Sequence, residues 1–461
     1  MMPPLSPQSL ASIDPSTGDV LATYEPDDAA TVEAALSRSR AAYARWHRTP
    51  LEARAAVLRA AADRLDAQRN DLAALATAEM GKRPVEARAE VEKCAWVLRH
   101  YADHAAVYLA DRPVATEARR SFVSFRPIGA VLAVMPWNFP FWQVFRCVAP
   151  ALAAGNVCVL KHASNVTGCA RAIGAVFDAV APEGVFEVLT LPSSRLAPVI
   201  EDPRIAGVAL TGSTPAGRAV AAAAGRALKK IVLELGGSDP YVVLADADLD
   251  RAVDVCLRAR FQNCGQSCIA AKRFVVVDEI ADAFVERLVA RMCALRVGPP
   301  ADPDTDLGPM ARTDLRDALH DQVVRSVEAG ATLRLGGEVP RGPGAFYPPT
   351  LLDGVRPGMP AHDEELFGPV AVVERAEGEA EALTLANATE FGLGAAVFSR
   401  ELDRATRIAR DELEAGACFV NDMVRSDPRL PFGGIRASGY GRELGAFGIL
   451  EFVNIKTVVV A

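Results

Sequence analysis

Short apolar segments that alternate with helical stretches constrain the fold of this chain more than any other feature of its sequence. From about residue 120 these segments are four to six residues long, and in order they are Ala130–Met135, Val157–Leu160, Val185–Leu189, Gly207–Leu210, Ile231–Leu235 and Tyr241–Leu244. Helical stretches such as Ala216–Lys230 separate most of them. Uninterrupted apolar strands joined by helices are typical of a parallel sheet that is buried on both faces. The alternation therefore predicts an α/β fold.

A second alternation begins near residue 270 and predicts a second α/β unit. Its clearest strands lie near Phe274–Val277 and Ala395–Ser399. The pair Gly236-Gly237 directly follows the strand Ile231–Leu235. We expect the two units to join at these glycines.

The two ends of the chain carry different signals. The first third is Ala-rich and predicts three helices, over residues 27–47 and 51–79 and after Pro84. The tail Ile449–Ala461 ends in a β-prone segment, which must pair with another strand. It is either an edge strand of its own domain or a strand added to a neighbouring subunit.

Composition excludes several classes of protein. Half of the 461 residues are hydrophobic, which is enough for a large core and excludes disorder of the whole chain. The net charge of −8 disfavours a nucleic-acid partner, because the field of the protein repels phosphate backbones. The longest clean apolar run, Ile128–Trp137, is too short to span a bilayer, so we expect no membrane partner. Residues Met1–Ser6 lack the basic and apolar regions of a signal peptide.

Cysteine and histidine usage indicates the compartment. The nine cysteines are scattered, with no CxxC motif and no Cys/His pair at zinc-ligand spacing, and the chain has only six histidines. We therefore expect no metal site. An odd number of irregularly spaced cysteines fits a reducing environment, so we expect a cytoplasmic protein.

Cys268 closes the segment Asn263-Cys264-Gly265-Gln266-Ser267-Cys268, between a helical run and a strand. A cysteine beside glycine and small polar residues is a candidate nucleophile, although a free thiol needs activation. The same pattern fits an inert cysteine that is buried as a small hydrophobic residue. The residues alone leave both interpretations open.

Glu234 and Asn138 are the next candidates. Glu234 lies inside an apolar strand, where an unpaired carboxylate is costly and a raised pKa would suit a general base. Prolines flank Asn138 in the segment Met135–Pro140, and its side-chain amide can donate hydrogen bonds to a developing oxyanion. A structural hydrogen-bonded glutamate and an asparagine that caps a helix are the alternatives.

Two further segments are candidate ligand contacts. Thr211–Gly217 follows a strand and opens a helix, so it is either a phosphate-binding turn or an ordinary helix start. It is not the GxGxxG fingerprint of classical dinucleotide-binding folds. The segment Glu365–Pro369 forms a rigid loop that offers a carboxylate to ribose hydroxyls and a ring to a flat ligand, or else a surface turn with a buried Phe367.

The joint order of these segments resembles the NAD(P)-dependent aldehyde dehydrogenase superfamily. PWNFP, GST, ELGG, GQSC, ELFGP, PFGG and SGYGRE follow one another, and the resemblance extends from about Ile13 to the C-terminus. Three segments are most similar to bacterial succinate semialdehyde dehydrogenases, and these are Phe141–Arg146, Leu160–Val166 and Gln262–Gln266.

The resemblance implies a fold and an assembly. It implies the aldehyde dehydrogenase fold, with a Rossmann-like cofactor-binding domain over 1–110 and 128–235 and an α/β catalytic domain over 236–437. A small β oligomerisation element over 111–127 and 438–461 would pair a hairpin with the C-terminal strand. That strand would extend the sheet of a partner in a homodimer or homotetramer.

The resemblance also implies an activity, the oxidation of an aldehyde to a carboxylate. Cys268 would be the nucleophile that forms a thiohemiacetal and then a thioester. Asn138 and the Cys268 backbone N–H would stabilise the oxyanion, and Glu234 would activate the water that releases the product. No histidine is needed as a base.

NAD or NADP is the implied cofactor. Gly212, Ser213 and the helix that follows would hold the pyrophosphate. Trp137 and Lys161 would flank the adenosine half. Ser164 occupies a position at which many NAD-preferring relatives carry an acid, and serine does not repel a 2′-phosphate. The sequence therefore leaves NAD and NADP open.

On the other half of the cofactor, Glu365 would hold the nicotinamide ribose and Phe367 would pack near the nicotinamide. For the substrate, the resemblance implies succinate semialdehyde, and Arg146 and Ser438 match residues that relatives use for its carboxylate. A second arginine of several relatives is replaced here by Gln262.

Several alternatives stay open. Arg260 or Arg425 is a candidate substitute for the missing arginine. Another small or medium aldehyde is an alternative substrate, and a cofactor-independent cysteine esterase or a catalytically silent member of the fold is an alternative function. Cys264 lies four residues before Cys268, so a regulatory disulfide is a further hypothesis if both lie on one helical turn.

Overall fold

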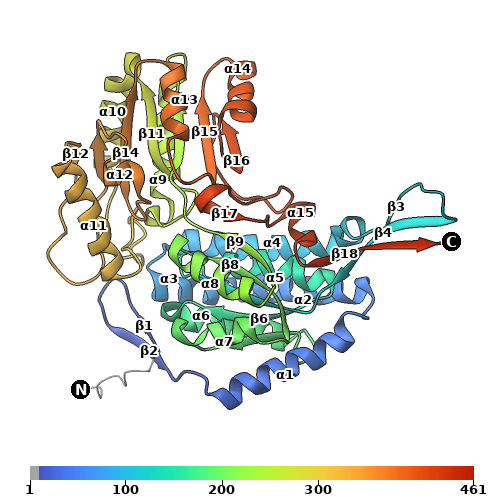
Figure 1. Ribbon diagram of the computed structural model, residues 1–461. Helices are drawn as coiled ribbons and strands as arrows, with labels where there is room; N and C mark the ends of the chain where they lie inside the picture. Colours follow the sequence, from blue (N-terminus) through green and yellow to red (C-terminus); the bar gives the residue numbers. More distant parts are fainter. Residues whose placement is uncertain (1–9) are drawn as a thin grey trace.

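Two large sheets organise the molecule, and a small third sheet projects from one side (Figure 1). The computed structural model describes residues 10–461, so the predictions for Met1–Ser6 lie outside the described residues. A short hairpin, β1 (Leu10–Ile13) and β2 (Val20–Tyr24), precedes the first helix. No helix within 10–461 is both long and apolar enough to cross a membrane.

The first sheet has six strands. In spatial order they are β17 (Gly439–Tyr440), β9 (Lys230–Glu234), β8 (Ile205–Thr211), β5 (Ala130–Met135), β6 (Val157–His162) and β7 (Phe186–Leu189). The five strands that the apolar runs predict pair in parallel, which confirms the predicted parallel sheet. The short β17 adds an antiparallel edge beside β9, and no apolar run indicated it.

Helices cover both faces of this sheet (Figure 1). They are α1 (Ala29–Trp46), α2 (Leu51–Ala67), α3 (Arg69–Met80), α4 (Pro84–Tyr108), α5 (Trp142–Ala154), α6 (Thr167–Asp178), α7 (Ala197–Glu201) and α8 (Thr214–Arg226), with 3₁₀ turns η1 (Ser164–Val166) and η2 (Ser193–Arg195). The prediction of one helix over 51–79 is wrong, because the backbone leaves the helical region at Gln68. This break turns α3 toward α6, while α2 packs on α4 and α5.

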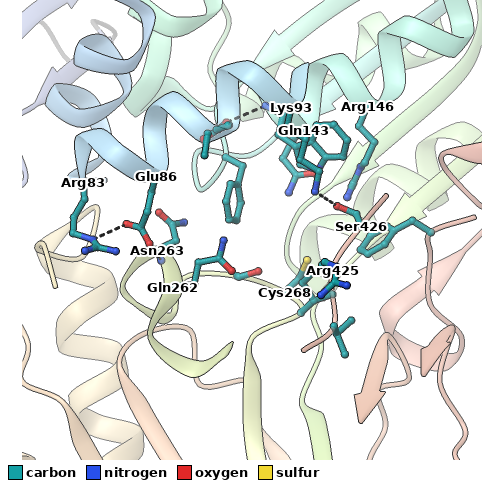
Figure 2. Close-up of a pocket in the computed structure, with 18 of the residues that line it drawn as sticks. Arg83, Glu86, Lys93, Gln143, Arg146, Gln262, Asn263, Cys268, Arg425 and Ser426 are labelled. Carbon is teal, nitrogen blue, oxygen red and sulfur yellow. Dashed lines mark hydrogen bonds and ion pairs between the residues drawn. The ribbon is translucent and has the colours of Figure 1, made fainter. Parts of the chain in front are cut away.

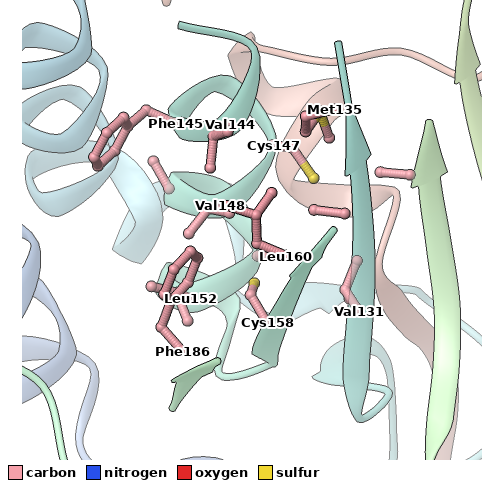
Figure 3. Packing of buried hydrophobic residues seen from close by; sticks show 14 of the residues in the cluster. Val131, Met135, Val144, Phe145, Cys147, Val148, Leu152, Cys158, Leu160 and Phe186 are labelled. Atoms are coloured by element: carbon pink, nitrogen blue, oxygen red, sulfur yellow. The ribbon is translucent and has the colours of Figure 1, made fainter. Parts of the chain in front are cut away.

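The core of the first unit lies between α5 and the strands β5 and β6 (Figure 3). Every residue of α5 is buried, and such a helix has no polar face to present to water. Val148 and Leu152 of this helix pack with Leu160 of β6. The packing of this apolar helix on the apolar strands therefore fixes the position of the carboxyl end of β5, where the next loop begins.

The second sheet has seven strands. In spatial order they are β12 (Thr332–Leu335), β13 (Thr350–Asp353), β14 (Val370–Ala376), β11 (Ala271–Val277), β10 (Asp239–Val243), β15 (Gly394–Phe398) and β16 (Ala417–Val420). All neighbours pair in parallel except β12, which is an antiparallel edge strand. The chain passes from β9 to β10 through Gly236-Gly237, where the sequence predicts the junction.

Further helices connect the strands of the second sheet and form part of the C-terminal region. They are α9 (Leu249–Phe261), α10 (Asp278–Cys293), α11 (Thr313–Glu328), α12 (Pro360–Asp363), α13 (Glu379–Asn387), α14 (Leu402–Arg407) and α15 (Gly445–Leu450), with the short turns η3 (Gln262–Gly265), η4 (Ile408–Glu412) and η5 (Arg436–Ser438).

The C-terminal strand β18 (Val453–Val460) pairs antiparallel along the whole of β4 (Arg120–Pro127). The predicted pairing of the 111–127 hairpin with the tail is therefore present. A two-residue strand, β3 (Arg112–Pro113), pairs with the other side of β4, which leaves β18 at an edge of this sheet. The sheet projects from the body, with the C-terminus at its tip (Figure 1).

A cluster of buried charged residues connects β11, β14 and α12 in the second part of the chain. Glu374 of β14 pairs with Arg273 of β11 at 3.3 Å and with His362 at 2.8 Å. Arg273 also donates to the backbone carbonyls of Leu385 and Ala386. Removing one partner of a buried pair is costly, because it leaves an uncompensated charge in the interior.

We expect Glu374→Met to destabilise the protein by about 3–5 kcal/mol, since it leaves Arg273 without its carboxylate. Urea denaturation followed by circular dichroism measures the change. Glu377→Met, just beyond β14 on the exposed surface, is the matched control and should leave the midpoint unchanged. Equal midpoints for the two variants would contradict a stabilising role for the cluster.

Candidate active site

The candidate site lies where the carboxyl ends of β5, β6, β8 and β9 meet the nucleophile segment of the second sheet. Ligands of open α/β sheets bind at this end of the strands. Cys268 follows α9 and the turn η3, just before β11 begins, and it lines a cavity of about 320 Å³ (Figure 2). Burial raises the pKa of its thiol to about 12, although Arg146 and Lys272 lower it in part.

Two cavities meet at the loop between β5 and α5. Phe139 lines the cavity that contains Cys268, and Trp137 lines a second cavity of about 690 Å³. Asn138 stands between them in the chain and is buried. Two residues of the PWNFP segment, Trp137 and Phe139, therefore face a cofactor-sized and a substrate-sized space, and Asn138 lies between them in the chain.

The side chain of Asn138 reaches the nucleophile segment. Its Nδ2 donates to the carbonyl of Gln266 at 3.1 Å, two residues before Cys268. Asn263 Nδ2 donates to the same carbonyl and to the carbonyl of Asn138, at 3.1 and 2.9 Å. Asn263 has a φ of +55°, which asparagine tolerates better than most residues. No local pattern in the sequence indicated this positioning role of Asn263.

Glu90 of α4 holds the same loop from the other side. Its carboxylate accepts from the backbone N–H groups of Phe141 and Trp142 at 2.8 and 2.9 Å, and it pairs with the buried Lys82. Sequence reasoning did not identify either residue. Lys82 and Glu90 are eight residues apart, and nothing in the local sequence indicates that they contact the PWNFP loop.

Glu234 is fully buried at the end of β9. Among the described residues, neither of its carboxylate oxygens has a hydrogen-bond partner. Burial raises its pKa well above the ordinary value, and Arg146 lowers it in part. A raised pKa suits a general base, and an unpaired buried carboxylate has this property.

The glycines after Glu234 bring β9 against the nucleophile segment. A Cβ on Gly237 would lie 2.7 Å from the Cys268 carbonyl oxygen, and one on Gly236 would lie 2.5 Å from Glu365. No larger residue fits either contact without a shift. Gly237 N–H also donates to Glu365 Oε1 at 3.0 Å. The ELGG, GQSC and ELFGP segments therefore meet at one point.

Glu365 has a second partner, Lys272 of β11, at 3.4 Å. The buried Lys272 also donates to the carbonyls of Ser267 and Cys268, at 2.9 and 2.8 Å. It links the nucleophile turn to the ELFGP loop. Lys272 was not predicted, because the sequence of a strand does not show which backbone carbonyls a lysine in it will contact.

Arg146 is fully buried on α5 and lines the cavity of Cys268. Its guanidinium pairs with Glu443 and donates to Thr211 Oγ1 at 3.2 Å. Burial lowers the pKa of Arg146, but Glu443, Glu234 and Cys268 outweigh burial and raise it overall. The nucleophile, the candidate base and Arg146 are thus electrostatic neighbours.

The remaining predicted substrate contacts differ in position. Gln262 and Arg425 line the cavity of Cys268, and Arg425 pairs with Asp422 at 2.7 Å. Ser438 does not line it and uses its hydroxyl to join Gly236 O and Gly392 N. Arg260 as a substitute substrate contact is wrong, because it is buried beneath the site and donates to the carbonyls of Gly265, Leu366 and Gly368.

The premise for a Cys264–Cys268 disulfide is also wrong. The two cysteines do not lie on one helical turn, because α9 ends at Phe261 and Cys264 has a left-handed φ of +54°. Cys264 packs into an apolar cluster with Met310 and Leu319, whereas Cys268 faces the cavity.

The larger cavity suits a dinucleotide. Trp137, Lys161, Ser164 and Gly212 line it, and Ser213 caps the N-terminus of α8 by accepting from Ala216 N–H. Lys161 Nζ lies 3.3 Å from Ser193 Oγ, and its ammonium has no carboxylate partner among the described residues. A helix N-terminus and an unpaired lysine both favour phosphate groups.

Trp137, which lines this cavity, packs edge-to-face on Phe367 with ring centroids 5.7 Å apart. Glu365 lies beside the Gly236-Gly237 turn, close to the nucleophile segment. Of the predicted cofactor residues, Trp137, Lys161, Ser164 and Gly212 line the larger cavity, whereas Ser213, Glu365 and Phe367 do not. Within 10–461, no group of three or more His, Cys, Asp or Glu side chains is arranged to hold a metal ion.

Comparisons with known proteins found similar proteins over nearly the whole chain. The aldehyde dehydrogenase family model matches residues 3–458. A probable succinate-semialdehyde dehydrogenase [NADP(+)] of Synechocystis is 49% identical over 98% of this chain and 100% of the relative. A succinate-semialdehyde dehydrogenase [NADP(+)] of Mycolicibacterium paratuberculosis is 49% identical over 97% of this chain and 96% of the relative.

Solved structures show the same fold. The succinic semialdehyde dehydrogenase of Streptococcus pyogenes, solved in complex with NADP+, superposes with a TM-score of 0.96. It is 37% identical, and the match covers 98% of this chain and 99% of that one. With this fold and a family match across nearly its whole length, the chain belongs to the aldehyde dehydrogenase family.

Proposed function

We propose that this chain oxidises succinate semialdehyde to succinate and uses NADP as the hydride acceptor. The observation that carries the proposal is the position of Cys268, which lines a small cavity beside a larger, phosphate-favouring one. The two relatives at 49% identity carry this substrate and this cofactor in their names, and they support both parts of the proposal.

In this proposal Cys268 attacks the aldehyde carbon as a thiolate. Burial raises the pKa of the thiol, so formation of the thiolate depends on Arg146 and Lys272, the two cations that lower this pKa in part, and the proton leaves to solvent. The Asn138 amide and the Cys268 backbone N–H stabilise the oxyanion that forms. The nicotinamide cofactor, when bound, supplies the hydride acceptor.

The second half of the reaction hydrolyses a thioester on Cys268. Glu234 removes a proton from the attacking water, and its raised pKa makes it a stronger base than an exposed glutamate. The water adds to the thioester carbon, and the Cys268 sulfur leaves. The same two hydrogen-bond donors stabilise this second oxyanion, so each half of the reaction uses Asn138.

The cofactor residues follow from the lining of the larger cavity. Lys161 and Ser164 lie where the adenosine ribose would sit, and Gly212 and Ser213 lie at the α8 N-terminus, where the pyrophosphate would sit. Ser164 offers a hydroxyl and no negative charge. These features favour the 2′-phosphate of NADP.

We further propose a cytoplasmic homodimer or homotetramer. Residues 111–127 and 438–461, which contain β4 and the edge strand β18, are the proposed oligomerisation element. An edge strand with unpaired backbone groups is a ready site for another chain. Light scattering coupled to size-exclusion chromatography would measure the assembly, and a monomer would overturn this part of the proposal.

The direct test is cofactor reduction at 340 nm with succinate semialdehyde and NADP, beside an ester-cleavage assay. Wild-type protein should reduce NADP, and Cys268→Ala should abolish reduction because it removes the nucleophile. Ester cleavage without cofactor reduction would indicate a cysteine esterase instead. Turnover that persists in Cys268→Ala would contradict the assignment of the nucleophile.

We expect Glu234→Gln to lower steady-state turnover about 100- to 10,000-fold, because an amide cannot activate water. Its rate should also lose the acidic limb of the wild-type pH profile. That limb reports a base that acts when deprotonated and whose pKa lies above the ordinary value. Stopped-flow absorbance and a pH series measure both effects, and an unchanged acidic limb would assign the base to another group.

Ser164→Glu should reverse the cofactor preference, because a carboxylate at this position repels a 2′-phosphate and accepts hydrogen bonds from a 2′-hydroxyl. We expect kcat/KM with NADP to fall at least about 10-fold, by the charge repulsion alone, while kcat/KM with NAD stays level or rises. Ser164→Ala is the matched control and should keep the preference for NADP. A Glu variant that still prefers NADP would contradict the placement of the ribose.

A further inference from the structure

Lys93 is a cation in the Cys268 cavity that the residues discussed so far leave without a role. It extends from α4, and its Nζ donates to Ser426 Oγ at 2.8 Å and lies 4.3 Å from the centre of the Trp142 ring (Figure 2). Lys93 lines both the Cys268 cavity and the outer space that adjoins it. A substrate that enters from this outer space therefore passes Lys93 on its way to Cys268.

The other cations of this cavity are paired with carboxylates. Arg146 pairs with Glu443, Arg83 pairs with Glu86 at 3.2 Å, and Arg425 pairs with Asp422 at 2.7 Å. Each pair is close to neutral as a unit, so its arginine carries little net charge to offer a ligand. Arg146 in particular holds a buried carboxylate that would compete with an anionic substrate.

Lys93 differs from these arginines. Within residues 10–461, no carboxylate oxygen lies within 4.0 Å of its Nζ. Two acids act on Lys93 from a greater distance: Asp427 pairs with Arg429, and Glu90 is bonded to Lys82 and to two backbone N–H groups. The hydroxyl of Ser426 and the face of Trp142 are neutral contacts. Lys93 therefore retains a net positive charge and two ammonium hydrogens with no partner in the protein.

We propose that Lys93, positioned by Ser426 and Trp142, binds the carboxylate of the substrate and so selects an anionic aldehyde over a neutral one. The inference rests on the proposed oxidation of succinate semialdehyde and assigns the recognition of its charged end. The lysine ammonium donates to the carboxylate oxygens, and Ser426 is close enough to Nζ to share in the same anion site. Arg146 then acts on Cys268 and Glu234, its electrostatic neighbours.

The test compares kcat/KM for succinate semialdehyde and for butanal, a neutral aldehyde with the same number of carbon atoms. In Lys93→Met the value for succinate semialdehyde should fall about 10- to 100-fold, the effect of one charge-assisted hydrogen bond, mainly through KM. The value for butanal should change less than about 3-fold. Lys93→Arg keeps the charge and should recover most of the loss.

Arg88→Met is the matched control. Arg88 lies on the same helix but is exposed and outside both cavities. Its removal deletes one positive charge without touching the site, and both substrates should keep their wild-type kcat/KM. A loss with Arg88→Met equal to that with Lys93→Met would show that only long-range attraction is involved, and it would overturn the inference.

A second readout separates recognition from packing. The charged and titratable groups that face Lys93 come from α4, α5 and the 424–427 segment, and they are Glu90, Cys94, Arg146, Arg425 and Asp427. Burial first and Arg146 second lower the Lys93 pKa to about 8, so the ammonium loses its proton as the pH rises through that value. The ratio of kcat/KM for succinate semialdehyde to that for butanal cancels the titration of Cys268 and Glu234.

We expect this ratio to fall between pH 7 and pH 9 in the wild type, because the cation is lost, and to stay flat in Lys93→Met and Lys93→Arg. Two results would overturn the role of Lys93. One is an equal loss of kcat/KM for both aldehydes in Lys93→Met, and the other is a wild-type ratio that stays flat between pH 7 and pH 9. Wild-type protein that oxidises butanal but not succinate semialdehyde would instead overturn the proposed substrate, so the two failures are distinguishable.

Discussion

Cys268 precedes β11 of the second sheet and Glu234 ends β9 of the first, and the close packing of Gly236 and Gly237 brings these two segments together. The last strand of the first sheet, β9, ends at Glu234, and the two glycines carry the chain into the second sheet against the Cys268 carbonyl and the Glu365 carboxylate. Any side chain at these positions would separate the strands from the nucleophile segment. Lys272 and Glu365 then fasten the same junction from the second sheet.

Charge in the site follows from this close packing. Burial raises the pKa of both Cys268 and Glu234, so neither group loses its proton as readily as it would at the surface. The cations around them are balanced by carboxylates, with Arg146 paired to Glu443. Lys93 lines the cavity of Cys268 and has no carboxylate partner among residues 10–461, and the proposed recognition of an anionic aldehyde depends on this difference.

Much of the fold was predictable from the sequence, because the central strands of the first sheet are largely apolar runs and Gly236-Gly237 marks the passage to the second sheet. The edges were not, since β12 and β17 are short, partly polar and antiparallel. The break at Gln68 also escaped prediction, because the direction in which α3 packs depends on α6, which lies far along the chain.

The candidate site divides in the same way. Motifs identified Cys268, Asn138 and Glu234, whose residue types and neighbours indicate their chemistry. Contacts between distant segments were not predictable, which is why Asn263, Lys272 and Lys93 were missed and why Arg260 was a wrong candidate. A spacing of four residues also predicted a Cys264–Cys268 approach that the left-handed turn at Cys264 prevents.

In the proposed mechanism, catalysis passes through a thioester on Cys268, and water activated by Glu234 hydrolyses it. Peptide mass spectrometry of Glu234→Gln, quenched after mixing with succinate semialdehyde and NADP, tests it most directly. The account predicts the mass of a succinyl group added to the peptide that carries Cys268, and no such addition when the cofactor is left out. Cofactor reduction without acylation of Cys268, or acylation of another cysteine such as Cys264, would contradict it.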